Sequence, residues 1–337
     1  MAIVNGQTYY RFDQSEDVVS DRQDISAGLW SGGAGTLLTI YTSSTQAIAS
    51  GQYYLDVYNY PQGTTTNTPE VQFSVAYGHI AGSGSSILNA QYPSKAIYTQ
   101  YRNVLLPPTD DYFTINSVNK NHILVINFKL DRIKQTIDPG NWQFTLSGSS
   151  AGSLVTMIDD SGQTTTATTG KAGRVFNVVS GTIAGGVASG GATFGLIYPD
   201  AGIIVLDPDT VNSSANVVAN VSSSNVASVN MWNFIVAMSG SMVSNNGFIA
   251  RNVENVASTH YFVRAKSAAF NFSNNPTFVT GTLGDLNNQD MIKNPTVYFT
   301  TIGMYNDNNE LLAVAKLSQP LKKSFTNEAL VRVKLDF

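Results

Sequence analysis

The sequence predicts a mainly β protein, built from antiparallel, sandwich-like sheets with a few short helices, and a mixed α+β arrangement is the alternative. Its apolar runs are rich in β-branched and aromatic residues and are bounded by Gly, Pro, Asn or Ser. Hydrophobic residues make up 42% of the 337 residues, which argues for an ordered chain. Charged residues make up 12% against about 25% in a typical soluble domain, so Ser, Thr, Asn and Gln must cover the surface.

Residues 1–146 are expected to form an N-terminal β-rich domain. Its strands are predicted at 36–42, 52–60, 71–77 and 122–128. The segment 138–142 (DPGNW) predicts a tight turn in which Gly140 supplies a positive φ. Helical spacing of Ala96, Ile97, Tyr101, Val104 and Leu105 predicts a short helix within 92–106.

Residues 147–245 read as a Ser/Gly-rich middle segment with strands and short helices. In 147–195 the sequence predicts one strand, 174–179, among small-residue loops. We expect this stretch to be loosely ordered in an isolated subunit and more protected in an assembly, because it has few large apolar side chains. Two strands follow in 194–208, and helices are expected in 209–245 from the spacing of Val217, Val221, Met231, Phe234, Ile235 and Met238.

Residues 246–337 are expected to form a C-terminal β domain. Strands are predicted at 260–265, 296–303, 311–317 and 329–337, and the polar segment 307–309 (DNN) predicts a hairpin turn. The last strand alternates cleanly, with Val331, Val333, Leu335 and Phe337 on one face. We therefore expect it to be a docked strand against which the hairpin packs, within the subunit or completed by a neighbour.

Charge, hydropathy and cysteine content limit the classes of partner and compartment that the sequence favours. The chain has 19 Lys and Arg against 23 Asp and Glu and shows no basic stripe, so direct binding to nucleic acid is not expected. No apolar run approaches the roughly 18 residues of a membrane span, and the N-terminus lacks the features of a signal peptide. The absence of cysteine removes disulfides and thiolate catalysis and fits a reducing cytoplasm.

One catalytic pattern occurs by sequence. Residues 148–152 (GSSAG) match G-x-S-x-G around Ser150, and Asp207 or Asp209 and then His260 follow in the order of a serine hydrolase. That mechanism needs a helix after the serine, but 153–162 (SLVTMIDDSG) reads as a strand and a turn. We therefore expect no enzyme activity and no catalytic residues.

No cofactor or metal site is predicted. His79, His122 and His260 show no paired spacing, so a histidine site would require distant residues to converge. Gly170-Lys171 lacks the hydroxyl residue and the earlier glycine of a phosphate loop. The remaining candidate groups lie where turns or strands account for them: Asp110–Asp111, Asp159–Asp160, and Asp307 with Glu310 for calcium, and Tyr53, Tyr54, Tyr58 and Tyr60 for a sugar.

Segments spread along the chain resemble virion structural proteins of tailed bacteriophages, particularly those with contractile tails. The strongest are 260–278 (HYFVRAKSAAFNFSNNPTF) and 295–325 (PTVYFTTIGMYNDNNELLAVAKLSQPLKKSF), with 71–85, 122–132 and 194–208 similar in style. The resemblance implies a structural subunit of the virion, a tail or baseplate component that binds other virion proteins and is oligomeric in the assembly. A capsid decoration or neck protein, or a carbohydrate- or receptor-binding tail module, is the alternative.

Overall fold

The structure is a computed structural model of the chain. It describes residues 2–4, 7–43, 53–63, 67–82, 93–148, 154–163, 168–215, 227–243, 247–273 and 275–336. Strands account for 49% and helices for 17%, with large antiparallel sheets and few short helices. The predicted fold class is confirmed.

The chain divides into two compact units. Unit 1 comprises Met1–Gln23 and Asn255–Phe337, and unit 2 comprises Asp24–Glu254. The chain passes from one unit to the other within strands β3 (Val18–Gly28) and β20 (Arg251–Ala265). These bounds differ from the three segments expected from the sequence, because the strands of 147–206 belong to the same sheet as those of 41–128.

Unit 2 is built on an 11-stranded sheet in which all neighbouring strands are antiparallel. The main path runs β12-β13-β15-β17-β18-β10-β7-β6-β5, and β14 and β16 pair with β15. The strands are β5 (Tyr41–Thr42), β6 (Leu55–Tyr58), β7 (Val71–His79), β10 (His122–Phe128), β12 (Phe144–Ser147), β13 (Leu154–Asp159), β14 (Thr168–Gly170), β15 (Gly173–Thr182), β16 (Gly186–Val187), β17 (Thr193–Tyr198) and β18 (Ile203–Leu206).

Shorter elements complete unit 2. The helices are α2 (Ser94–Leu105), α3 (Leu130–Ile133), α4 (Pro208–Ala215) and α5 (Ala227–Val243), with a 3-10 turn at Ser31–Gly33. The small strand pairs are β4 (Thr36–Leu37) with β19 (Phe248–Ile249), β8 (Phe113–Ile115) with β9 (Val118–Lys120), and β11 (Thr136–Ile137) with β20. Helices at 94–105 and 227–243 match the predicted ones, whereas Val217 and Val221 lie outside the described residues.

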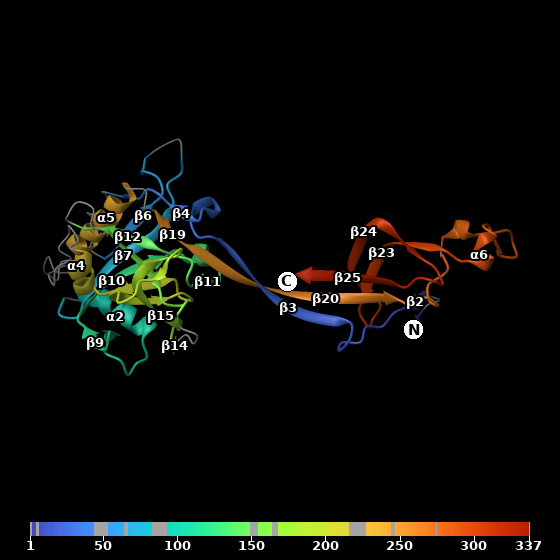
Figure 1. The fold of residues 1–337 in the computed structure, drawn as a ribbon, viewed down its shortest axis with the longest axis horizontal. Helices are drawn as coiled ribbons and strands as arrows, with labels where there is room; N and C mark the ends of the chain where they lie inside the picture. Colours follow the sequence, from blue (N-terminus) through green and yellow to red (C-terminus); the bar gives the residue numbers. More distant parts are fainter. Residues whose placement is uncertain are drawn as a thin grey trace. The chain divides into compact units, whose positions relative to one another are not determined.

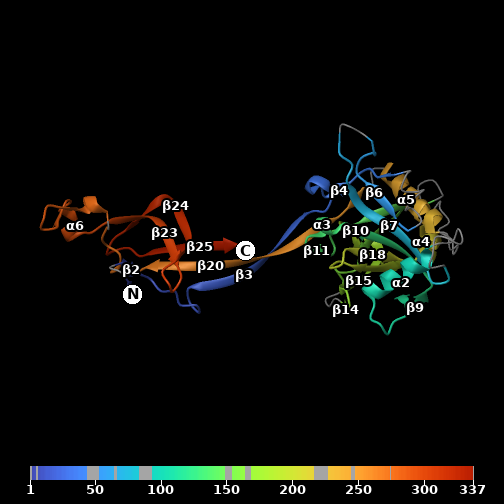
Figure 2. The same ribbon diagram turned by 180° about the vertical axis from the view of Figure 1, so that it is seen from behind.

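Helices cover both faces of the centre of this sheet. Figures 1 and 2 show α5 and α2 on opposite sides of β7 and β10. On one face Gly78 of β7 lies against α2, where a Cβ atom would come within 2.8 Å of the Tyr98 backbone. Since successive side chains of a strand point to opposite faces, Phe73, Val75 and Tyr77 lie on the face that α5 covers.

An aromatic cluster forms the core on the α5 side. Phe73 and Phe128 are directly opposite each other in the β7–β10 register, with ring centroids 6.2 Å apart. Phe248 lies within 5.7 Å of both rings, and Trp30 donates its indole N–H to the Phe248 carbonyl at 2.8 Å. The rings are tilted or edge-on, which is the favourable geometry for aromatic pairs. This cluster joins β7 and β10 to β19 and to the loop before β4.

The predicted turn at 138–142 is confirmed, with Gly140 at φ 79°. Asp159, which is buried at the end of β13, holds it. Its carboxylate accepts the Gly140 N–H at 2.8 Å, the Trp142 indole N–H at 2.5 Å and the Ser161 N–H at 2.9 Å. Asp159 therefore satisfies three donors of two loops at once.

Residues 147–195 are more regular than the sequence predicts. The predicted strands are present: 174–179 lies in β15, the strand read in 153–162 is β13, and the strand beginning at 194 is β17. The described part also contains β14 and β16, which the sequence did not predict. Glycine allows this packing: a Cβ atom on Gly181 would clash with the Gly186 carbonyl oxygen and with Ile158, and one on Gly195 would clash with the β18 backbone. Small residues in this segment therefore allow neighbouring strands to pack closely, and they also form loops.

Unit 1 is the second β unit. Besides its parts of β3 and β20 it contains β1 (Ala2–Val4), β2 (Gln7–Tyr9), a 3-10 turn at Pro276–Phe278, β21 (Val279–Thr280), β22 (Asp285–Leu286), α6 (Asp290–Lys293), β23 (Val297–Tyr305), β24 (Leu311–Lys323) and β25 (Ala329–Asp336). β25 pairs with β20 from Ala329 opposite Ala265 to Asp336 opposite Ser258. β23 and β24 form a separate two-stranded sheet.

The predicted hairpin and closing strand are both present. The turn between β23 and β24 is closed by the Asn306 side chain, which accepts the N–H groups of Asn308 and Glu310, and Asn309 has φ 63°. In β25, Val331, Val333 and Leu335 are less exposed than Leu330, Arg332 and Lys334, as the alternation predicts. The hydrogen-bonded partner of β25 is β20, so the closing strand does not extend the hairpin sheet.

Replacing Asp159 with alanine should lower the free energy of unfolding by about 1–3 kcal/mol, because the buried Trp142 N–H loses its acceptor. Asp131→Ala is the control: this exposed side chain pairs with exposed Lys129, and its loss should change stability by no more than about 0.5 kcal/mol. Urea unfolding of both variants measures the difference. Equal stabilities would show that Asp159 does not hold the turn.

Deleting residues 330–337 should abolish soluble folding of the chain. The deletion removes the strand paired with β20 and side chains that each contribute up to about 1.5–3 kcal/mol when buried, against a total domain stability of about 5–15 kcal/mol. Soluble yield and melting temperature are the readouts, and Leu330→Ala, on the exposed face of β25, is the control. A truncated chain that melts at the wild-type temperature would contradict the docked strand.

Candidate functional site

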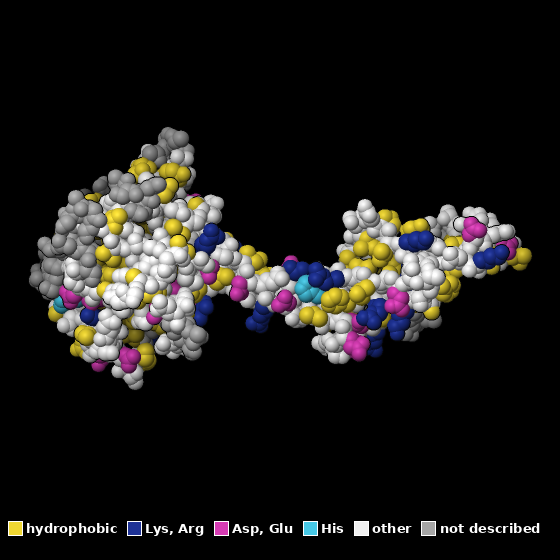
Figure 3. Space-filling view, in the orientation of Figure 1, with side chains coloured by type: hydrophobic (Ala, Val, Ile, Leu, Met, Phe, Trp, Pro, Cys, Tyr) yellow, Lys and Arg dark blue, Asp and Glu magenta, His cyan; other side chains and the backbone are white. Residues whose placement is uncertain are grey.

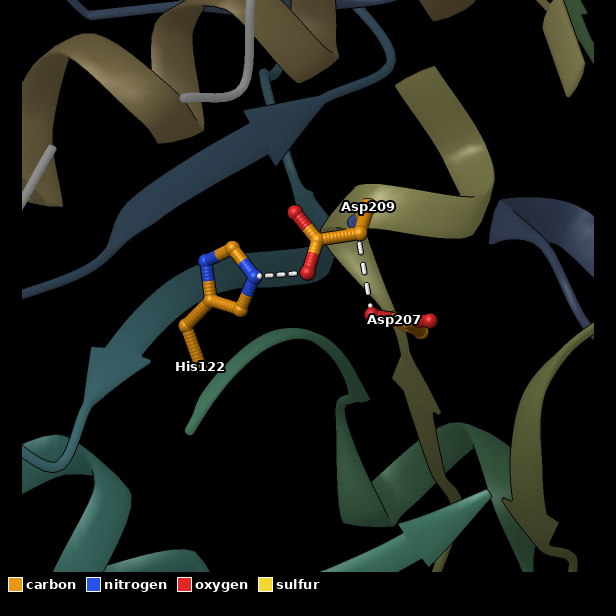
Figure 4. A group of neighbouring side chains, drawn as sticks. All are labelled: His122, Asp207 and Asp209. Carbon is orange, nitrogen blue, oxygen red and sulfur yellow. Dashed lines mark hydrogen bonds and ion pairs between the residues drawn. The ribbon is translucent and has the colours of Figure 1, made fainter. Parts of the chain in front are cut away.

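A polar cluster lies in unit 2 where β10 begins and β18 ends. One ligand-type atom each of His122, Asp207 and Asp209 lies within 4.8 Å of the others. Figure 4 shows Asp209 between the other two, with its carboxylate toward the His122 ring. His122 and Asp207 are buried, whereas the Asp209 side chain is 66% exposed.

Strand register brings these residues together. In the β7–β10 pair, His79 is directly opposite His122, and the two rings lie 5.6 Å apart. In the β10–β18 pair, Leu206 is opposite Leu124, so the chain leaves β18 at Asp207 beside the start of β10. The spacing of His79, His122, Asp207 and Asp209 along the sequence does not indicate that they lie close together in the fold.

Asp207 has a structural role at the start of α4. It precedes Pro208, the first helical residue, and its carboxylate accepts the Asp209 N–H at 3.3 Å and the Thr210 hydroxyl at 2.5 Å. This is the geometry of a helix N-cap with proline at the first position. The same fully buried carboxylate pairs with the Lys120 ammonium at 2.7 Å, which neutralises its charge.

His122 is held at both ring nitrogens. The Tyr77 hydroxyl lies 3.1 Å from Nδ1, and Nε2 lies 2.9 Å from Asp209 Oδ2. One neutral tautomer satisfies both contacts, with Nε2–H donating to the carboxylate and Nδ1 accepting the hydroxyl proton. Asn230 of α5 hydrogen-bonds the Tyr77 hydroxyl, whose pKa is raised well above its usual value by burial and then by Asp209.

This arrangement favours a structural network over a reactive centre. A general base needs a ring nitrogen that faces a substrate, but both nitrogens of His122 are engaged by Tyr77 and Asp209. A cation at the three ligand atoms would have to displace the Lys120 ammonium from Asp207. The network instead ties β7, β10 and the β18–α4 connection to α5.

The residues of the serine-hydrolase pattern are divided between the two units and the residues outside the description. Ser150 lies outside the described residues, and the flanking strands β12 and β13 form an antiparallel hairpin, as the sequence predicts for the chain after the motif. His260 belongs to unit 1, where it lies opposite Lys334 in the β20–β25 register.

The remaining sequence candidates have local partners. Lys171 donates to the Asn103 carbonyl at 2.5 Å, Asp160 accepts from Asn177, and Asp111 pairs with Arg102. Tyr53, Tyr54 and Tyr60 are exposed around β6.

Unit 2 also contains a cavity of about 370 Å³. Its lining includes one carboxylate, that of Asp110, and one phenol, that of Tyr198, and the other lining residues contribute apolar, hydroxyl and amide groups.

Comparison with known proteins gave no match to a family model, to a curated protein or to a solved structure. Within the described residues, none of the helices has the length and apolar character needed to cross a membrane.

The polar cluster predicts an acid-sensitive contribution of His79 to stability. Burial, and then His122, lower the pKa of His79 below its usual value of about 6.5. Between the lowered pKa and about pH 6.5 the unfolded chain therefore binds more protons, and stability is lost as the pH falls through this window. We expect His79→Gln to reduce the decrease in melting temperature between about pH 7.5 and pH 5.

The control for this measurement is Gln100→Asn, an exposed change on α2 that adds no titrating group. It should retain the full wild-type decrease. An identical decrease for His79→Gln and the wild type would mean that His79 does not contribute.

Proposed function

We propose that the chain is a structural subunit of a tailed-bacteriophage virion, a tail or baseplate component that acts through protein–protein interfaces. The observation that carries the proposal is the exposed apolar surface of the β23–β24 sheet in unit 1. Tyr298, Tyr305, Leu311, Leu312, Val314 and Leu321 are all exposed there. Figure 3 shows apolar side chains gathered at the surface over these strands.

Such a surface is unusual for a protein that works alone. Two-stranded sheets are only marginally stable in water, and contiguous exposed apolar side chains mark sites of association. Among the described residues no strand pairs with the outer edge of the hairpin, and an open strand edge favours pairing with another chain. A subunit whose hairpin is covered in an assembly accounts for both features.

One of the two strongest resembling segments contains this surface. The segment 295–325 comprises β23, the turn and β24, and 260–278 comprises the end of β20 and the loop that follows. Low overall charge supports the same proposal, because buried interface cores are depleted in charged residues. The polar cluster of unit 2 adds no reactive group that would favour an enzyme.

Mass spectrometry of purified virions tests the proposal. We expect the chain in intact particles at a fixed ratio to other virion proteins, and in the tail fraction after heads and tails are separated. A peptide tag inserted between Gly281 and Gly284, where Leu283 is 89% exposed, should give extra density on the tail in electron microscopy. Absence of the chain from particles would refute the proposal, and a location in the head would refute the tail assignment.

A further inference from the structure

We infer that the open edge of β24 pairs with β24 of a second copy of this chain, antiparallel and about a two-fold axis at Val314. This inference deepens the proposed function, because it names a partner for the exposed hairpin. β24 pairs with β23 on one edge, and among the described residues no strand pairs with its other edge.

The regular part of β24 identifies the segment that can pair. From Ala313 to Lys316 each residue has its own partner in β23, whereas register shifts lie on either side: one near Leu311 and Leu312, and one between Lys316 and Leu321. An edge must be regular over several residues to receive another strand. The stretch centred on 313–316 provides this.

Composition of the edge favours another copy of the same strand. The segment 311–317 (LLAVAKL) is apolar, contains neither Pro nor Gly and carries a single charge, Lys316. Unit 1 has ten Lys and Arg and ten Asp and Glu, so two copies do not repel through net charge. An antiparallel pair of identical strands is self-complementary, because a two-fold axis places residue i opposite j and j opposite i.

The charge of Lys316 disfavours two of the possible registers, and the regular stretch 313–316 favours an axis close to its middle. In antiparallel strands, side chains that lie directly opposite each other point to the same face of the sheet. A two-fold axis normal to the sheet must therefore lie midway between the two copies of one residue, and the register is named by that residue. An axis at Lys316 would oppose the two ammonium groups directly, and one at Ala315 would offset them along the strand by about 7 Å, less than the Debye length of about 8–10 Å. An axis at Val314 offsets them by about 14 Å and places each Lys316 opposite Leu312 of the other copy.

The register with its axis at Val314 also brings the apolar surfaces of the two copies together. Leu312 and Val314, which are 69% and 54% exposed, lie on one face with Lys316. Beside Val314 in the hairpin is Gly303, against which the Tyr305 ring and Leu311 lie. Pairing at Val314 would therefore bring the apolar faces of two hairpins into one four-stranded sheet.

Cysteine crosslinking of the full-length chain tests the register, since the protein has no cysteine of its own. Val314→Cys places two thiols opposite each other at the axis, within the Cα distance of about 4.4–6.8 Å that a disulfide requires. We expect this variant to form a covalent dimer on mild oxidation. Leu312→Cys is the matched control on the same face: its two thiols would be about 14 Å apart along the strands and should stay unlinked.

Sedimentation velocity over a concentration series tests the contact itself. The wild type should show a monomer–dimer equilibrium, and Val314→Lys should raise the dimer dissociation constant at least about tenfold through like charges at the axis. Val314→Thr, which keeps the β-branched shape, should dimerise as the wild type does. A mixture of Val314→Lys and Val314→Glu should recover the dimer, which also shows that the variants are folded.

The inference is overturned if the wild type is monomeric throughout, if Val314→Lys dimerises normally, or if Leu312→Cys crosslinks better than Val314→Cys. These outcomes differ from failure of the proposed function. A chain that dimerises through β24 but is absent from virions refutes the virion assignment alone. A chain that is present in virions but insensitive to Val314→Lys refutes the β24 pairing alone.

Discussion

The structure of unit 2 depends on the pairing of β7 with β10. Seven consecutive residue pairs, from Phe73–Phe128 to His79–His122, fix the register of two strands whose middle residues are buried on both faces. A shift by one residue would turn every side chain to the opposite face and would separate the Phe73 and Phe128 rings from the α5 side. The helices, the aromatic core and the polar cluster are all placed relative to this pair.

One register thus serves two different environments. At one end of the pair, Phe73 and Phe128 pack with Trp30 and Phe248 in an apolar core. At the other end, Tyr77 and His122 continue the same face as polar groups that share one hydrogen bond. Because buried polar groups are costly unless paired, the contacts of Asp209 with His122 and of Asn230 with Tyr77 stabilise this end.

Local patterns in the sequence predict local structure, and long-range register explains what they miss. The strands at 71–77 and 122–128, the turn at Gly140 and the hairpin at 307–309 follow from residue type and spacing, so these predictions are confirmed. The meeting of His79 and His122 depends on which of many strands pair, and no local pattern carries that information. In 147–195, glycines such as Gly181 and Gly195 permit close packing of strands. A segment rich in such glycines has the same residue composition as a flexible loop, and for this reason the strands β14 and β16 were missed.

Unit 1 combines a fixed hairpin base with an exposed hairpin tip. At the base Lys323, opposite Val297, is fully buried, and its ammonium donates to the Ser267 carbonyl at 2.9 Å and to Asn271 Oδ1 at 2.7 Å. Burial lowers the pKa of Lys323, so these acceptors are needed to hold a charge away from water. Since the base is anchored in this way while Leu312 and Val314 stay exposed near the tip, a partner strand can add to the hairpin without refolding of the unit. Under the proposed pairing, the cost of association includes the ordering of the exposed side chains at this tip.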